Sequence, residues 1–307
     1  MPATIRIGTR ESQLAVWQAS QVQALLATQG ISAELIYIKS KGDIDLKTPL
    51  YEIGVQGIFT KNLDIALLEN QIDLAVHSLK DVPTQVPLGI RQAAVLKRGP
   101  VSDLLVFKNG DGFLNDPDYQ AGIATSSIRR RALWLSRYPH HQIHNLRGNV
   151  NTRLKKLESE GWDAAIFAQA GLERIGLRPE NSQVIDWMLP APAQGAIVVV
   201  CRADDEKGYQ SCQRFNDADT ALCTRIEREF LRTLEGGCST PVSALAVSDN
   251  GSIHFRGSIV SLDGRHTAQT EKWVDATGAA ELGREAATEL LQNGGREIAE
   301  SIRHAAT

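Results

Sequence analysis

The chain has 307 residues, which is room for two or three domains at about 150 residues each. Hydrophobic residues make up 42% of it and charged residues 22%, a globular composition that excludes collagen-like, low-complexity and disordered chains. The formal net charge of −3 argues against a general nucleic-acid binder. Four cysteines are too few for a disulfide scaffold.

Metal sites and membrane segments are not expected either. The cysteines form no CxxC pair, so no metal site is predicted. The amino-terminal residues lack a basic stretch followed by an apolar run, and no segment approaches the ~18 apolar residues that a membrane span needs. We therefore expect a cytoplasmic protein that binds neither membrane nor nucleic acid.

Strands and helices alternate through the first two thirds of the chain. In order, the pattern predicts a strand over 4–7, a helix beginning near Ser12, a strand over 33–38, a helix over 59–69 and a strand over 73–76. It continues with a strand over 122–125, a helix over 128–138, a strand over 142–146, a helix over 151–159 and a strand over 163–168. Residues 197–201 predict a buried parallel strand, and 220–234 predict a helix. This alternation is typical of α/β domains with mostly parallel sheets.

The tail from Ser243 has a different pattern. It predicts three strands over 244–247, 253–259 and 267–274 and a helix over 279–291, which together make a small α+β unit. Candidate domain boundaries lie near Gly99, near 190–192 and near 216–219, where proline, glycine and polar residues gather.

The balanced net charge conceals a basic stretch. Residues 121–157 contain no Asp or Glu, but they hold eight cations: Arg129, Arg130, Arg131, Arg137, Arg147, Arg153, Lys155 and Lys156. Such cations repel one another unless an anion neutralises them. The alternative is a solvated basic face that pairs with acids from elsewhere in the fold.

Three strand–helix turns carry arginine together with a hydroxyl or amide residue, at 9–12, 125–130 and 147–149. Helix N-termini at the carboxyl edge of an α/β sheet attract anions. Arg129 and Arg130 stand in a first helical turn, where they oppose the helix dipole, and local rules tend to break at functional sites. These turns predict a polyanionic ligand held between the α/β units and leave open whether it carries carboxylates or phosphates.

Two further segments carry chemistry. Lys80 and Asp81 follow a strand at the same edge, so Asp81 could stabilise a cation; the alternative is a turn aspartate that bonds the backbone. For His77, which belongs to the same segment, the alternative to a functional role is a packed, hydrogen-bonded side chain. Cys238 lies in a Gly-Gly-Cys loop that follows a helix. The negative C-terminal end of that helix raises the pKa of the thiol, which disfavours a role as a nucleophile. It does not disfavour a thiol that is alkylated once and then serves as an anchor. The other three cysteines are expected to be inert.

Eight motifs, taken in order, resemble the porphobilinogen deaminase (hydroxymethylbilane synthase) family. They are TRESQLAVWQ at 9–18, KGD at 41–43, LLENQIDLAVHSLKDVPT at 67–84, GIATSSIRRRA at 122–132, LRGNVNTRL at 146–154, AGLERIGL at 170–177, PAPAQGAI at 190–197 and LEGGCSTPV at 234–242. They span nearly the whole chain.

The resemblance implies a transferase that joins four porphobilinogen molecules head to tail, releasing ammonia, to give hydroxymethylbilane for tetrapyrrole biosynthesis. It implies a dipyrromethane cofactor held by a thioether to Cys238 and a catalytic Asp81, which stabilises positive charge on the pyrrole nitrogen. The resemblance assigns cofactor contacts to Asp43, Lys80, Thr125, Ser126, Ser127, Arg129, Arg130 and Arg153. It assigns substrate contacts to Arg10, Ser12, Phe59, Arg147, Arg174 and Gln194.

The implied fold is α/β, with two domains like the halves of a periplasmic binding protein and a smaller α+β C-terminal domain. The domains expected are 1–98 with 195–216, then 99–194, and finally 217–307, which carries the cofactor cysteine. The family also suggests a monomer. The sequence departs from the family pattern at Glu52 and Gln56, at Ser102, and at Pro192-Ala193, where Val-Gly is usual.

Two rival functions remain at this point. One is a non-catalytic anion-binding protein of the periplasmic type, and the other is a nucleic-acid binder that uses the basic stretch. The missing signal peptide disfavours the first, and the low aromatic content of 6% disfavours the second.

Overall fold

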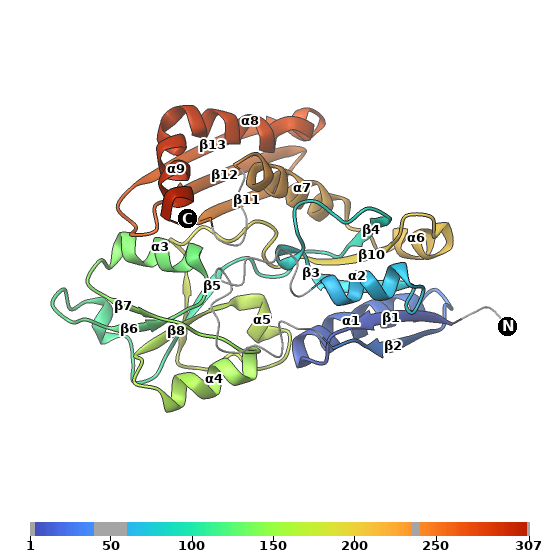
Figure 1. Cartoon of the computed structure of the whole chain (residues 1–307), viewed down its shortest axis with the longest axis horizontal. Helices are drawn as coiled ribbons and strands as arrows, with labels where there is room; N and C mark the ends of the chain where they lie inside the picture. Colours follow the sequence, from blue (N-terminus) through green and yellow to red (C-terminus); the bar gives the residue numbers. More distant parts are fainter. Residues whose placement is uncertain (1–3, 40–59, 235–239, 306–307) are drawn as a thin grey trace. The chain divides into compact units, whose positions relative to one another are not determined.

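The computed structural model describes residues 4–39, 60–234 and 240–305 (Figure 1). Contacts divide the described chain into two compact units. The first contains 4–39, 60–100 and 194–222, and the second contains 101–193, 223–234 and 240–305.

The first unit is built on a five-stranded sheet in the order β2-β1-β3-β10-β4. Its strands are β1 (Ile5–Thr9), β2 (Ala33–Tyr37), β3 (Leu74–Ser78), β4 (Ile90–Val95) and β10 (Ile197–Arg202), and its helices are α1 (Gln13–Ala27), α2 (Lys61–Leu68) and α6 (Glu206–Gln213). The short 3-10 turn η2 (Leu79–Asp81) follows β3 directly. Ala19, Val22 and Leu26 of α1 are buried against this sheet.

The predicted direction of β10 is wrong. Its first five residues are buried, as expected, but it pairs antiparallel with both β3 and β4. The chain enters β10 beside the carboxyl end of β3, where Ile197 is paired with Ser78, so the strand must run back across the sheet. Burial on both faces marks a central strand but does not fix its direction.

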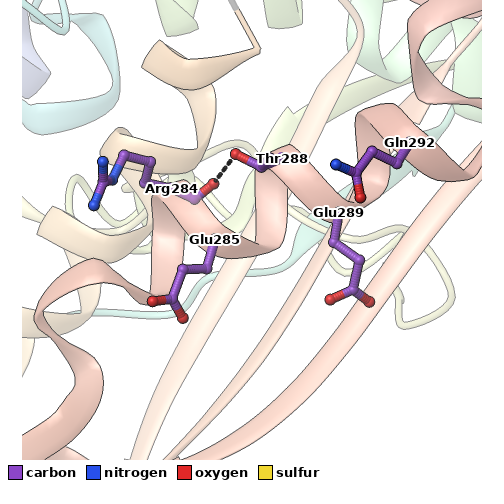
Figure 2. A pocket seen from close by; sticks show the side chains of 5 residues that line it. All are labelled: Arg284, Glu285, Thr288, Glu289 and Gln292. Carbon is purple, nitrogen blue, oxygen red and sulfur yellow. Dashed lines mark hydrogen bonds between the residues drawn. The ribbon is translucent and has the colours of Figure 1, made fainter.

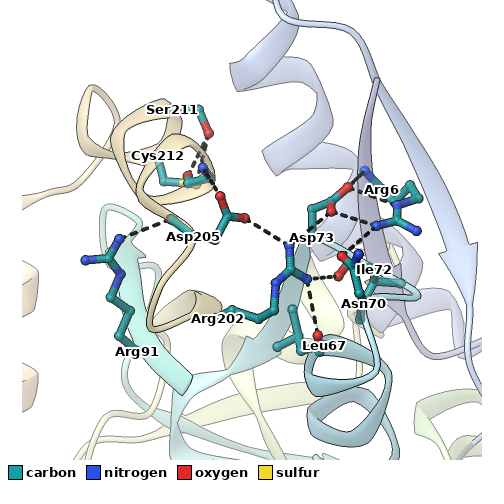
Figure 3. A network of polar contacts seen from close by, with 11 residues as sticks. Arg6, Leu67, Asn70, Ile72, Asp73, Arg91, Arg202, Asp205, Ser211 and Cys212 are labelled. Atoms are coloured by element: carbon teal, nitrogen blue, oxygen red, sulfur yellow. Dashed lines mark hydrogen bonds and ion pairs between the residues drawn. The ribbon is translucent and has the colours of Figure 1, made fainter. Parts of the chain in front are cut away.

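A network of ion pairs joins the elements of this unit near the amino end of β3 (Figure 3). The Asp73 carboxylate accepts hydrogen bonds from Arg6 Nη2 at 2.8 Å and from Arg202 Nη2 at 3.3 Å. Arg202 also donates to the carbonyls of Leu67 and Ile72. The network therefore links β1, α2, β3 and β10 at the edge opposite to the predicted ligand edge.

The second unit contains a sheet of the same topology, in the order β7-β6-β8-β5-β9. Its strands are β5 (Asp103–Phe107), β6 (Gly122–Ala124), β7 (Gln142–His144), β8 (Ala164–Ala168) and β9 (Ser182–Ile185), and its helices are α3 (Ile128–Arg137), α4 (Val150–Ser159) and α5 (Gln169–Glu173). In each sheet three parallel strands are followed by one antiparallel strand and an edge strand that is antiparallel to it. Four of the five strands therefore run one way, as the mostly parallel prediction requires.

The predicted α+β part makes up the rest of the second unit, and its first helix begins within the last residues assigned to the first unit. Helix α7 (Ala218–Thr233) precedes an antiparallel sheet of β11 (Val242–Asp249), β12 (Ser252–Val260) and β13 (Thr267–Asp275), and α8 (Leu282–Leu290) and α9 (Arg296–Ala305) follow. The predicted helix over 279–291 begins later than expected, because 276–281 form a 3-10 turn, and α9 was not predicted. Phe230 of α7 packs on Phe255, 5.1 Å between ring centroids. The predicted fold class of two α/β sheets with a smaller α+β part is confirmed, whereas the three-domain division stays a prediction.

Candidate functional site

The first predicted anion-binding turn joins β1 to α1. β1 ends at Thr9, and the partly buried Arg10 follows it. Ser12 caps α1, because its hydroxyl accepts a hydrogen bond from the Ala15 N–H at 3.4 Å. The predicted helix start near Ser12 is therefore confirmed, and Arg10 lies at the carboxyl edge of the sheet.

The second turn follows β3 and carries Lys80 and Asp81. Lys80 Nζ donates to Gln194 Oε1 at 3.2 Å, and Gln194 is only 1% exposed. Asp81 is exposed, and no hydrogen bond or ion pair to its side chain occurs in the described residues. The alternative interpretation of Asp81 is a turn aspartate whose side chain bonds the backbone. Its side chain makes no such hydrogen bond in the described part of the chain.

His77, the next-to-last residue of β3, is packed as its alternative interpretation expects. It is 7% exposed, and burial together with the positive charge of Arg10 lowers its pKa to about 3, so the ring is neutral. Its Nε2 atom has no hydrogen-bond partner among the described residues, so the expected hydrogen bond is missing at that atom.

Sequence reasoning missed Gln18, which supports the same turn. Gln18 lies on the buried face of α1 and is 2% exposed. Its Nε2 donates to Ser78 Oγ at 2.8 Å, directly before the Lys80–Asp81 turn. A polar residue on an otherwise apolar helix face was the available signal.

In the second unit, the turns after β6 and β7 are tied together. Ser126 Oγ donates to the Leu146 carbonyl at 2.6 Å and accepts from the Leu146 N–H at 2.9 Å. Ser127 caps α3 by accepting from the Arg130 N–H at 3.4 Å, and Thr125 accepts from the Ser127 N–H at 3.2 Å. The three hydroxyls predicted to contact the cofactor thus shape the N-terminus of α3.

Arg129 and Arg130 both pair with Asp103, which sequence reasoning did not identify. Arg129 Nη2 lies 2.7 Å from one carboxylate oxygen and Arg130 Nη2 lies 2.8 Å from the other. Burial alone would raise the pKa of Asp103, but the two guanidinium groups outweigh it and hold that pKa well below its usual range. For these two cations the alternative is correct in part: an acid from elsewhere pairs with them, although in the interior rather than on a solvated face.

Three more predicted arginines belong to the second unit. Arg147 follows β7 and is 3% exposed, beside Gly148, whose φ of +114° opens the turn before α4. Arg153 lies in the first part of α4. Arg174 directly follows α5, and burial lowers its pKa to about 10, so it stays protonated at neutral pH.

Several predicted residues lie outside the described residues: Asp43, Phe59 and Cys238 of the site, and Glu52 and Gln56 among the departures from the family pattern.

Cys201, Cys212 and Cys223 are buried, and burial raises the pKa of Cys212 to about 12, as the inert interpretation requires. No group of metal-ligating side chains occurs in the described ranges. Within the same ranges no helix combines the length and apolar character that a membrane crossing needs.

A hollow on the surface of α8 contributes nothing to the predicted site. It is lined by Arg284, Glu285, Thr288, Glu289 and Gln292 (Figure 2). Thr288 donates to the carbonyl of Arg284, one turn earlier in the helix. None of the predicted site residues lines it, and its two carboxylates do not suit an anionic ligand.

The fold and these turns define an α/β protein that gathers arginine and hydroxyl side chains at the carboxyl ends of its parallel strands, a class that binds anionic small molecules. The family model "Porphobilinogen deaminase, dipyromethane cofactor binding domain" matches residues 5–210, and "Porphobilinogen deaminase, C-terminal domain" matches residues 221–292. The chain belongs to the porphobilinogen deaminase family.

Curated relatives agree with this assignment. Proteins named porphobilinogen deaminase from Chlorobium phaeobacteroides (strain BS1) and Acidithiobacillus ferrooxidans (strain ATCC 53993 / BNL-5-31) are each 40% identical over 311 residues, covering 99% of this chain and 99% or 100% of the relative. One from Syntrophomonas wolfei is 41% identical over 298 residues, covering 96% of this chain and 97% of its own. The family polymerises porphobilinogen into hydroxymethylbilane in tetrapyrrole biosynthesis and uses a dipyrromethane cofactor.

Solved structures give a weaker likeness. The methionine binding protein MetQ is 13% identical with a TM-score of 0.45, covering 71% of this chain and 92% of that chain. A probable amino-acid transporter extracellular-binding protein from Bacillus subtilis is 11% identical with a TM-score of 0.45, covering 69% and 89%. Because both TM-scores lie below 0.5, neither likeness bears on function.

Proposed function

We propose that this chain joins four porphobilinogen molecules head to tail, with loss of ammonia at each addition, and releases hydroxymethylbilane. Asp81 is the residue proposed to act on the reacting atoms. The observation that carries this role is its exposed carboxylate, which has no partner among the described residues although Lys80 stands beside it. A carboxylate in that state is available to a cationic substrate.

The chemistry needs such a carboxylate at one point. When the aminomethyl C–N bond of porphobilinogen breaks and ammonia leaves, positive charge develops on the pyrrole nitrogen. The Asp81 carboxylate would stabilise this charge, and its effect is largest where bulk water is excluded. Lys80 is held by Gln194, which keeps the cation from closing an ion pair with its neighbour.

The dipyrromethane cofactor carries acetate and propionate groups, and the side chains of the second unit suit such carboxylates. The α3 N-terminus offers backbone N–H groups beside Thr125, Ser126 and Ser127, and Arg129 has a buried Nε–H that finds no acceptor in the described chain. We propose that these residues, with Lys80, Asp43, Arg130 and Arg153, hold the cofactor. When bound through Cys238, the group supplies the pyrrole carbon to which the first substrate is joined.

The remaining assignments concern substrate and organisation. We propose that the incoming substrate contacts Arg10, Ser12, Phe59, Arg147, Arg174 and Gln194. The charged and polar side chains among them would bind its carboxylates, and Phe59 would offer an apolar ring. We also propose that the chain folds as three domains, 1–98 with 195–216, 99–194 and 217–307, and acts as a cytoplasmic monomer. Sedimentation at several protein concentrations tests the monomer.

The mass of the purified protein tests the attachment. The intact mass should exceed the sequence mass by one dipyrromethane, and Cys238→Ser should abolish this excess. Cys201→Ser is the matched control and should keep it, because Cys201 is buried. Active protein with an unmodified Cys238 would overturn the proposal.

A substitution of the same shape tests the role of Asp81. Asp81→Asn should leave the melting temperature unchanged, because the carboxylate has no partner in the described part of the chain, and should reduce turnover at least about 100-fold, the loss of one electrostatic stabiliser. Near-normal formation of hydroxymethylbilane would refute the role.

A further inference from the structure

Trp134 and His141 share a hydrogen bond in the interior of the second unit. Trp134 lies in the second half of α3 and is 1% exposed, and His141 directly precedes β7 and is 7% exposed. The Trp134 Nε1–H donates to His141 Nδ1 at 3.1 Å. Because an indole nitrogen can only donate, Nδ1 must carry a lone pair, and the ring is neutral with its proton on Nε2.

Aromatic rings surround this hydrogen bond. Tyr138 stacks on His141, with 4.9 Å between the ring centroids and 12° between the planes. Phe113 lies 5.9 Å from the same ring, and Trp187 packs on Trp134 at 5.9 Å. Of these neighbours only the Tyr138 hydroxyl can accept a hydrogen bond. A second proton on His141 would therefore be a buried charge in apolar surroundings, which is unfavourable.

The electrostatic surroundings also favour a neutral His141. Burial is the largest influence and lowers its pKa, the Asp163 carboxylate acts the other way, and His140 adds a smaller lowering. Asp163 already accepts hydrogen bonds from the Tyr119 hydroxyl at 2.9 Å and from the Gly122 N–H at 2.7 Å. The neutral ring is thus the stable form in the folded protein. The other ionisable side chains around the pair, among those the structure describes, are Tyr138 and Arg137, which lies over the Tyr138 and Trp187 rings.

The pair holds the carboxyl end of α3. The Tyr138 N–H donates to the Trp134 carbonyl, and the His141 N–H donates to the Tyr138 carbonyl at 3.2 Å. The turn between β12 and β13 rests on the same stretch of helix. A Cβ atom placed on Gly264 of that turn would lie 2.4 Å from the Ser136 nitrogen, so the two backbones touch. Whatever loosens the end of α3 also removes the support of this turn.

We propose that His141 and Trp134 form a pH-sensitive clamp, which holds the end of α3 at neutral pH and releases it in acid. A second proton, taken from water, would sit on Nδ1 and face the Trp134 Nε1–H, so that two donors oppose each other and the hydrogen bond is lost. In the open form His141 meets water and protonates near its usual pKa of about 6.5. Acid therefore stabilises the open form, and the clamp acts independently of the proposed function.

Hydrogen exchange of the Trp134 indole N–H tests the clamp, because this proton exchanges when the pair opens. Protonation of the open form alone should lower the protection of this N–H about tenfold between pH 7.5 and pH 5.5, after correction for the intrinsic exchange of indole at each pH. Trp134→Phe identifies the signal by removing it.

Two asparagine variants supply the comparison. His141→Asn keeps an acceptor near the position of Nδ1 but does not titrate, so its protection should fall about tenfold less than that of the wild type over the same range. His140→Asn, at the exposed neighbour, is the matched control and should show the wild-type fall. Equal falls in His141→Asn and the wild type would overturn the clamp.

The wild-type protein alone decides if His141→Asn does not fold. Nitrogen NMR should place the His141 proton on Nε2 at pH 7.5, and the ring should protonate only below its usual pKa of about 6.5. A proton on Nδ1 at pH 7.5 would overturn the proposal, because that nitrogen could not accept from Trp134. The Gly264 N–H, which donates to the Ser261 carbonyl at 2.9 Å, should lose protection over the same pH range. Constant protection there would overturn the link between the clamp and the turn.

Discussion

Gly195 occupies a backbone position that leaves no room for a side chain. Its φ is +84°, and a Cβ atom there would lie 2.7 Å from the carbonyl oxygens of Gly99 and Pro100. Left-handed backbone costs alanine about 1–2 kcal/mol, partly offset by about 0.4–1 kcal/mol from the stiffer unfolded chain. The contacts add about 1–3 kcal/mol, because both are with backbone rather than with a flexible side chain. We therefore expect Gly195→Ala to lower the free energy of unfolding by about 2–4 kcal/mol.

Gly30→Ala is the matched control, and thermal unfolding is the assay. Gly30 has a φ of +73° but no described atom within 4 Å of a Cβ placed there, so only the backbone cost of about 1 kcal/mol remains. At about 2–4 °C per kcal/mol, Gly195→Ala should melt roughly 4–16 °C below the wild type and Gly30→Ala a few degrees below it. Equal shifts in the two variants would refute the argument from close approach.

The same substitution should affect the turn that carries Lys80 and Asp81, which we propose to be catalytic. Gly195 lies between Gln194 and Ala196. Gln194 accepts a hydrogen bond from Lys80 Nζ, and the Ala196 carbonyl accepts one from the Leu79 N–H at 3.0 Å. A shift of this segment therefore moves the turn that carries Asp81. We expect kcat of Gly195→Ala to fall at temperatures well below its melting point, and a wild-type kcat would show that the turn is positioned independently.

Local chemistry made part of the site predictable. Ser12 and Ser127 were expected at helix starts, and both cap their helices, because a cap depends on residues within one turn. The strand–helix turns were found for the same reason, since they follow from hydrophobic period and short polar motifs.

Partners distant in the sequence were not predictable. Asp103 lies 26 residues before Arg129, and nothing in the local pattern connects them. Glu227, 0% exposed, accepts from the Ala193 N–H at 2.6 Å and the Ala246 N–H at 2.8 Å, again across long separations. The basic stretch lacks acids of its own, but the fold brings one in through β5, so a charge count along the chain could not assign each arginine.

Three further predictions follow from backbone and burial. Ala193 has a φ of +61°, so Ala193→Gly should relieve about 1 kcal/mol of strain and raise the melting temperature by a few degrees; a lower value contradicts this. Burial would raise the pKa of Asp73, but hydrogen bonds from Arg6 and Arg202 outweigh it and lower that pKa. The stability advantage of the wild type over Asp73→Asn is thus complete above the unfolded pKa of about 3.9 and shrinks below it, which urea unfolding at pH 7 and pH 3 measures; an unchanged gap refutes it. For His77, burial and Arg10 lower the pKa to about 3, whereas the unfolded chain protonates near its usual value of about 6.5. The unfolded state therefore binds the extra proton between these values, and stability falls there by up to about 1.4 kcal/mol per pH unit as the pH drops. His77→Gln removes this titration, so its melting temperature should fall less steeply than that of the wild type from pH 7 to pH 4, and parallel curves would show that the folded protein protonates His77 without cost.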